Sequence, residues 1–167
     1  MKKIIQISLL ALAVLFSSCS EKEMKVYESS SDMVKDAQSC VETITAEDLK
    51  SAVENEEKLY IIDCREENEY DSACIKGAVN VPRGLAEFTI SNAAPERRSK
   101  LVVYCSNGDR SSLLASVLPK MKFSNVVVLE GGFENWKQQF PDLVELEPKS
   151  AQHETKVAGP PSGGCGG

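Results

Sequence analysis

The hydrophobic positions of the chain fall into short continuous runs that are separated by segments of mixed polarity. The runs that are typical of buried strands lie at residues 59–62, 77–82, 101–104 and 126–129. The segments between them carry apolar residues at helical spacing or begin with helix-starting residues, at 45–53, 66–71, 84–94, 111–118 and after 131–132. Apolar strands that alternate with helices predict a mostly parallel sheet covered by helices on both faces.

Two chemically active side chains come at the ends of predicted strands. Asp63 follows the first apolar run, and Cys105 follows the third. In parallel α/β sheets, ligands bind beyond the carboxyl ends of the strands. We therefore expect Asp63 and Cys105 to lie at one edge of the sheet and to share one pocket.

The first eighteen residues have the layout of a bacterial secretion signal. Two lysines open the segment, residues 4–16 are almost unbroken apolar sequence, and two serines precede Cys19. The apolar stretch is short for a membrane span of about 20 residues. The Phe-Ser-Ser-Cys run at 16–19 resembles a lipobox, which implies removal of residues 1–18 and lipidation of Cys19. We expect a lipid-anchored protein of the bacterial cell envelope, periplasmic or surface-facing; plain secretion or an uncleaved anchor are the alternatives.

The rest of the chain divides by composition into three parts. Residues 19–42 hold the lipidated cysteine and a polar, serine-rich tether with at most one weak helix. Residues 43–140 contain all the predicted strands and are expected to form the single folded domain. Residues 141–167 become polar and then rich in glycine, proline and serine, which is typical of a flexible tail.

Composition narrows the classes of function. The 167 residues allow one domain and little more, and a formal net charge of −6 disfavours nucleic-acid binding. The single histidine, His153, makes a histidine-rich metal site and a Ser-His-Asp hydrolase improbable. Six cysteines are too few for a disulfide scaffold but many for a reduced cytosolic enzyme. We expect thiol chemistry without a metal or an organic cofactor, and no prediction is made for the oligomeric state.

The loop that begins at Cys105 carries the chemistry. It continues through Ser106, Asn107, Gly108, Asp109 and Arg110 into a predicted helix. Backbone N–H groups of such a loop can converge into an anion-binding nest, and the helix N-terminus adds partial positive charge. These features lower the pKa of a thiol to about 3.5–7.5. A thiolate held in this way needs no separate general base, and the same N–H groups can hold a persulfide.

Four segments of the chain, in this order, resemble the motifs of rhodanese-like sulfurtransferases. They are Asp-x-Arg-Glu at 63–66, Gly-Ala-x-Asn-x-Pro at 77–82, Cys-x-x-Gly-x-Arg at 105–110 and Gly-Gly-aromatic-x-x-Trp at 131–136. The resemblance extends over roughly residues 43–140. It implies a rhodanese-like α/β domain with a five-stranded, mostly parallel sheet flanked by helices.

The resemblance also implies a reaction. Cys105 would take sulfane sulfur from a small donor, thiosulfate or a persulfide, and pass it to a thiol or another nucleophilic acceptor. The loop from Ser106 to Arg110 would bind the persulfide, with Asp63 and Arg65 in support. Family relatives that act on phosphate or arsenate have one residue more in this loop. The six residues from cysteine to arginine therefore favour sulfur.

Individual predictions follow for the side chains around the loop. The Asp109 carboxylate is expected to face solvent and to leave its N–H for the nest. Asp63 is expected to hydrogen-bond to loop backbone. Arg65 is expected to form a surface ion pair with Glu66 or Glu69, which contributes little to stability.

The other cysteines leave alternative functions open. Cys64 and Cys74 stand where the family commonly has valine and histidine, and we expect them to fill the core. Cys165 lies in a glycine-rich run and is the candidate for a relay thiol that takes sulfur from Cys105 or forms a disulfide with it. No role is predicted for Cys40. The alternatives are a thiol-redox protein that uses Cys105 with a second cysteine, a non-catalytic binding module with this fold, and a phosphatase or arsenate reductase.

Overall fold

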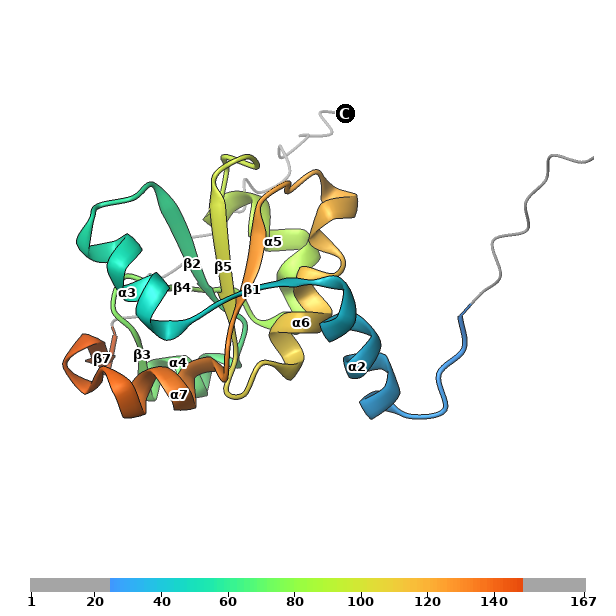
Figure 1. The fold of residues 1–167 in the computed structure, drawn as a ribbon, viewed down its shortest axis with the longest axis horizontal. Helices are drawn as coiled ribbons and strands as arrows, with labels where there is room; N and C mark the ends of the chain where they lie inside the picture. Colours follow the sequence, from blue (N-terminus) through green and yellow to red (C-terminus); the bar gives the residue numbers. More distant parts are fainter. Residues whose placement is uncertain (1–24, 149–167) are drawn as a thin grey trace, which may run out of the picture.

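Three of the four apolar runs form the middle of a parallel sheet, and the fourth, 77–82, contains a strand at its edge, in the computed structural model, which describes residues 25–148 (Figure 1). The five strands lie in the order β1-β6-β5-β2-β4, and every neighbouring pair is parallel. They are β1 (Glu42–Ile44), β2 (Leu59–Asp63), β4 (Val79–Asn80), β5 (Lys100–Tyr104) and β6 (Val126–Leu129). The predicted five-stranded parallel α/β fold is confirmed.

Helices cover both faces of this sheet (Figure 1). On one face lie α3 (Ala46–Glu54), α4 (Glu67–Ser72) and α7 (Gly132–Gln139), and on the other lie α5 (Ala86–Ala93) and α6 (Asp109–Ala115). Short 3-10 turns flank three of these helices: η2 (Arg83–Leu85) precedes α5, η3 (Leu118–Met121) follows α6 and η4 (Pro141–Leu143) follows α7. The helix at 45–53 begins where expected because the Thr45 hydroxyl accepts the N–H of Asp48 at 3.1 Å.

Successive residues of the central strands point into two separate cores. In β5, Val102 and Tyr104 pack with Trp136 on the α7 side, whereas Leu101 and Val103 pack with Ile90 on the α5 side. This is the alternation expected of a strand that is buried on both faces. The same alternation determines to which side of the sheet the side chains directly after each strand point. These side chains form the candidate active site.

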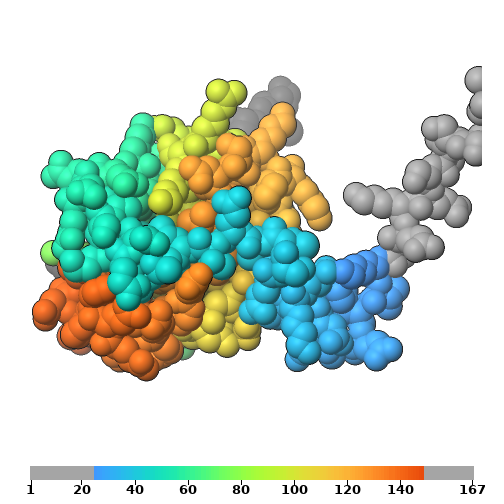
Figure 2. Space-filling model, viewed as in Figure 1, coloured from blue at the N-terminus to red at the C-terminus, as the bar shows by residue number. Residues whose placement is uncertain are grey.

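The segment before the sheet is more ordered than the predicted tether. Helix α2 (Ser30–Cys40) occupies most of the second half of 19–42, and its cap Ser29 accepts the N–H of Asp32 at 3.2 Å. The helix packs against α6, with Ala37 buried between them. Figure 2 shows this part of the chain, in blue, as a projection at one end of the domain. A helix with a single buried residue gives little periodicity, which explains why the sequence predicted only a weak helix here.

The start of the predicted tail also belongs to the fold. Strand β7 (Val144–Leu146) pairs antiparallel with β3 (Ala73–Ile75), and Val144 packs against the core. A flexible tail from residue 141 is therefore wrong for 141–146; a three-residue strand is too short to show alternation in the sequence.

Several predictions concern residues outside the described range. The signal segment 1–18 and Cys19 precede it, and His153, Cys165 and the rest of the predicted tail follow it. Within residues 25–148, no helix combines the length and the apolar character that crossing a membrane requires.

Candidate active site

Cys105 lies directly after β5, with its sulfur enclosed by the loop that follows. The residue has no exposed surface, and its Sγ accepts the backbone N–H of Gly108 at 3.2 Å. Gly108 has φ +105°, in the left-handed region that favours glycine, and is the residue before α6. The predicted arrangement of a thiol facing loop amides at a helix N-terminus is therefore present in the structure, although the sulfur is more enclosed than an open nest would make it.

Ser111 adds a second donor that the sequence did not single out. Its hydroxyl lies 3.6 Å from Cys105 Sγ and 3.0 Å from the carbonyl oxygen of Gly108. A hydroxyl has one proton, so Ser111 can donate to only one of these acceptors at a time. The Gly108 carbonyl also accepts from the hydroxyl of Ser112 at 2.8 Å, so Ser111 can turn to the sulfur without leaving that carbonyl unpaired.

The nearest strand end places Cys64, rather than Asp63, beside Cys105. Asp63 pairs with Tyr104 in the β2–β5 register, and the N–H of Cys64 donates to the carbonyl of Tyr104 at 2.9 Å. Cys64 and Cys105 are therefore the next facing pair, and both belong to the core on the α5 side. Asp63 lies on the opposite side of the sheet because successive residues alternate. The expectation that Asp63 and Cys105 share one pocket is wrong.

The surroundings favour the anionic form of Cys105. A hydrogen bond from the Cys64 thiol, together with hydrogen bonds from Ser111 and from the Asn107 backbone, lowers the pKa of Cys105 to about 5, although burial opposes this shift. Donation to that anion and burial raise the pKa of Cys64. At neutral pH, Cys105 is a thiolate and Cys64 keeps its proton.

Arg110 fixes the loop to the neighbouring helix instead of reaching for the sulfur. Its guanidinium donates to both carboxylate oxygens of Glu69, at 2.7 and 2.8 Å, and to the hydroxyl of Ser106 at 3.0 Å. Ser106 in turn donates to Glu69 at 3.1 Å. Two parallel N–H···O bonds of this kind set both distance and orientation. Glu69 is thus a site residue that the sequence analysis placed only as a possible surface partner of Arg65.

The N-terminus of α7 holds the other side of the loop. Phe133 and Glu134 donate their N–H groups to the carbonyls of Cys105 and Ser106, at 2.8 and 3.1 Å. This requires close approach, since a Cβ on Gly132 would lie 2.4 Å from the Cys105 carbonyl oxygen. Gly132 also has φ +61°. The Gly-Gly pair after β6 therefore shapes the site through its backbone.

Asp63 and Arg65 form a buried ion pair beneath the site. The Arg65 guanidinium donates to Asp63 at 2.6 and 3.0 Å and to the carbonyl of Ala73 at 2.7 Å, and it lies 4.2 Å from the centre of the Phe133 ring. The predicted surface pair of Arg65 with Glu66 or Glu69 is wrong. Side chains alternate along an extended segment, so Asp63 and Arg65 point to one side of the sheet and Cys64 to the other. This places the guanidinium of Arg65 beside the carboxylate of Asp63.

Asp109 is held at the surface of the loop. Its carboxylate accepts from the side-chain amides of Asn107 at 2.9 Å and of Gln38 at 3.2 Å. The carboxylate therefore points away from the sulfur, as predicted. Its N–H donates to Asn107 Oδ1 at 3.2 Å and is not part of the cradle around Cys105, which corrects the second half of that prediction.

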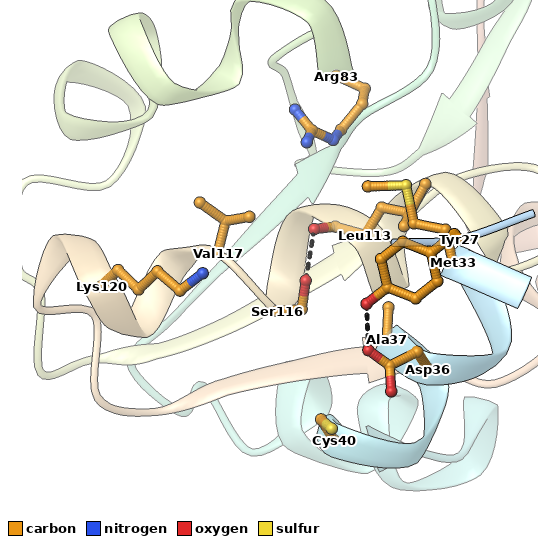
Figure 3. Close-up of a pocket in the computed structure, with 10 residues that line it drawn as sticks. All are labelled: Tyr27, Met33, Asp36, Ala37, Cys40, Arg83, Leu113, Ser116, Val117 and Lys120. Atoms are coloured by element: carbon orange, nitrogen blue, oxygen red, sulfur yellow. Dashed lines mark hydrogen bonds between the residues drawn. The ribbon is translucent and has the colours of Figure 1, made fainter. Parts of the chain in front are cut away.

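A separate hollow of about 340 Å³ lies between α2, η2 and α6 (Figure 3). Met33 and Leu113 are among its apolar lining residues, and Cys40 lies at its α2 side (Figure 3). Arg83 and Lys120 bring two positive charges to its lining. No residue of 105–110 lines this hollow, so it is distinct from the cradle of Cys105.

The structure is thus that of an α/β domain with a parallel sheet, in which a cysteine directly after a central strand is held by the loop that follows it. The chain belongs to the rhodanese-like domain family, whose family model matches residues 45–139. The motifs identified in the sequence all lie within this range.

Curated relatives carry sulfur-related descriptions. The chain is 35% identical over 103 residues to the probable adenylyltransferase/sulfurtransferase MoeZ of Mycobacterium tuberculosis, covering 61% of this chain and 26% of that protein. It is 31% identical over 98 residues to the putative sulfur carrier protein YrkF of Bacillus subtilis, covering 59% and 52%. The thiosulfate sulfurtransferase GlpE of Pseudomonas fluorescens is 31% identical over 87 residues, covering 52% and 77%. The chain therefore spans about a quarter of the first relative and half of the second.

Solved structures agree with the fold. A protein from Rhodopseudomonas palustris, described as a possible tyrosine phosphatase, is 28% identical with a TM-score of 0.59, covering 70% of this chain and 94% of that one. A thiosulfate sulfurtransferase from Pseudomonas aeruginosa has a TM-score of 0.62 at 21% identity, covering 71% and 23%. The second likeness concerns the fold alone.

Proposed function

We propose that the protein is a sulfurtransferase that carries sulfane sulfur on Cys105. The observation that carries this proposal is the sulfur of Cys105, held by the Gly108 N–H at 3.2 Å and with its pKa lowered to about 5. A thiolate is the reactive form of a cysteine toward sulfur, and it is present here at neutral pH without a base. The sulfur-related relatives support the same chemistry.

The reaction proceeds in two steps. The Cys105 thiolate attacks the outer sulfur of a donor such as thiosulfate, the donor S–S bond breaks, and sulfite leaves while a persulfide forms on Cys105. A thiol or another nucleophile then removes the outer sulfur and returns the thiolate. Because Cys105 has no exposed surface and its Sγ contacts Asn107, Gly108 and Ser111, a donor reaches the sulfur only when part of this loop moves. This requirement favours small donors.

The test is turnover of thiosulfate with a dithiol acceptor by the full chain, by Cys105→Ser and by Cys74→Ala. We expect sulfite release from the parent chain and from Cys74→Ala, since Cys74 is buried on the other side of the sheet. Cys105→Ser should release none. Equal rates for the parent chain and Cys105→Ser would overturn the proposal.

The same preparation distinguishes sulfur from phosphate chemistry. The six-residue loop from Cys105 to Arg110 supports sulfur, whereas a relative of similar fold is described as a possible tyrosine phosphatase. Hydrolysis of p-nitrophenyl phosphate that depends on Cys105, without sulfite release from thiosulfate, would replace the proposal by a phosphatase.

We further propose that the domain is tethered to a membrane of the bacterial cell envelope through Cys19. The support is the sequence of the first nineteen residues: two lysines, an apolar stretch and the Phe-Ser-Ser-Cys run. Labelling of cells with a fatty acid analogue should mark the parent chain and not Cys19→Ala. Equal labelling of both would show that Cys19 is not the lipidated residue.

A further inference from the structure

Cys64 and Cys105 occupy facing positions at the ends of two neighbouring strands. The register of β2 and β5 ends with Asp63 opposite Tyr104, and Cys64 and Cys105 are the next residues of the two chains. The N–H of Cys64 donates to the carbonyl of Tyr104 at 2.9 Å, and both cysteines pack in the core on the α5 side. Neighbouring strands lie about 4.8 Å apart. Disulfides join residues whose Cα atoms are about 4.4–6.8 Å apart, so the spacing of neighbouring strands is compatible with a bond between these two thiols.

We propose that Cys64 is a resolving thiol that releases sulfide from a Cys105 persulfide and leaves a Cys64–Cys105 disulfide. The inference rests on the proposed function, since that function loads the sulfane sulfur onto Cys105. It adds an activity, because the sulfur then leaves as sulfide when no acceptor removes it first.

Atoms and electrons balance within the pair. The outer sulfur of the persulfide anion first takes the proton of Cys64, which leaves Cys64 as a thiolate. This thiolate attacks Cys105 Sγ, the bond between Cys105 Sγ and the outer sulfur breaks, and the outer sulfur leaves as HS⁻. The two thiol sulfurs are oxidised together by two electrons, and the sulfane sulfur is reduced to sulfide by the same two. The step therefore needs no further oxidant. An external dithiol then reduces the disulfide by exchange and returns both thiols.

The loaded sulfur provides an acceptor for the proton of Cys64. While Cys105 is a thiolate, Cys64 donates a hydrogen bond to it and keeps its proton. After loading, the negative charge moves to the outer sulfur, which takes this proton before Cys64 attacks.

The other described thiols lack this position. Cys74 is buried, but its partner in the register of β3 and β7 is Glu145, and it belongs to the core on the α7 side. Cys40 is exposed at the end of α2. Among residues 25–148, Cys64 is therefore the thiol that the sheet presents directly to Cys105.

The experiment loads the reduced full chain with thiosulfate under anaerobic conditions, without an added thiol. Sulfite, sulfide, intact mass and peptide maps are measured for the parent chain, Cys64→Val and the matched control Cys74→Val. We expect the parent chain and Cys74→Val to release sulfite and sulfide in equal amounts and to lose the mass of two hydrogens, with Cys64 linked to Cys105. Cys64→Val should release sulfite only and gain the mass of one sulfur.

The outcomes separate this inference from the proposed function. A parent chain that releases sulfite but keeps its persulfide, with Cys64 reduced, overturns the inference and leaves the sulfurtransferase intact. A disulfide from Cys105 to Cys40, Cys74 or Cys165 also overturns it. No sulfite from any chain overturns the proposed function itself. If Cys64→Val does not fold, the peptide map of the parent chain decides.

Discussion

The guanidinium of Arg110 donates two hydrogen bonds to the carboxylate of Glu69, one from Nη1 to Oε2 at 2.7 Å and one from Nη2 to Oε1 at 2.8 Å. This pair joins the first turn of α6 to α4, and so connects the loop of Cys105 to the part of the chain that follows β2. It lowers the pKa of Glu69 to about 2, mainly through the hydrogen bonds from Arg110. Replacing Glu69 should therefore show how much the pair contributes to the stability of the domain and how that contribution depends on pH.

Glu69→Gln should change the acid dependence of stability. A carboxyl with a lowered folded pKa contributes stability above its unfolded pKa of about 4.3 and loses it as the pH falls toward about 2. Both side chains are about one-third exposed, so solvent screening reduces the contribution to about 1–2 kcal/mol. Urea unfolding at pH 7 should show this loss for Glu69→Gln, and the difference from the parent chain should shrink by pH 2–3.

The matched control for Glu69 is Glu87→Gln. Glu87 pairs with Arg83 one helical turn away, at 2.9 Å, and helix pairs of this type contribute about 0.3–0.5 kcal/mol. If Glu87→Gln lowers the free energy of unfolding as much as Glu69→Gln does, the two hydrogen bonds of Arg110 contribute no more to stability than an ordinary helix pair.

Gly132→Ala should destabilise the domain by about 2 kcal/mol or more. The new Cβ would meet the Cys105 carbonyl oxygen at 2.4 Å, in a backbone conformation of φ +61° that non-glycine residues rarely adopt. Gly84→Ala is the control, because a Cβ there has no atom within 4 Å and should change stability by less than about 1 kcal/mol. Equal urea midpoints for the two variants would contradict this account of the α7 contact.

Asn107→Asp should raise the pKa of Cys105 by about one unit or more. Asn107 Oδ1 lies 3.8 Å from the sulfur, so a carboxylate there would place a like charge beside the thiolate. The rate of iodoacetamide alkylation against pH reports this pKa: in the parent chain it should rise through about pH 5 and be level by pH 7. Asn107→Ala separates the effect of charge from that of the lost amide. An alkylation midpoint for Asn107→Asp at or below that of the parent chain would contradict the prediction.

Arg65→Ala should destabilise the protein by about 3–5 kcal/mol, because it leaves the Asp63 carboxylate buried without its partner. The double variant Asp63→Asn, Arg65→Met removes both charges and should recover part of that loss in urea unfolding. If the single and double variants are equally unstable, the contact with Ala73 and Phe133, and not the ion pair, determines the role of Arg65.

Sequence patterns predicted most of what depends on local order. Continuous apolar runs gave the three central strands, the Thr45 cap located α3, and the motif at 105–110 located the thiol and its loop. They could not predict β1 and β7, because strands of three residues are too short to show a period and form through their partners.

Contacts between side chains on neighbouring strands were harder to predict than the strands themselves. The position of Cys64 beside Cys105 depends on the register between β2 and β5, which strand propensity does not determine. Counting both residues as the first after their strands would have suggested the pairing. The Arg65 error has the same origin, since an arginine among acidic residues in the sequence resembles a surface residue until its direction relative to the sheet is known.

The two outer strands of the sheet, β1 and β4, have three and two residues. Each therefore offers few unpaired backbone groups to a strand arriving from another molecule, and short edges of this kind are a common protection against edge-to-edge aggregation. We therefore expect copies of this domain at high concentration to resist association through the edges of their sheets.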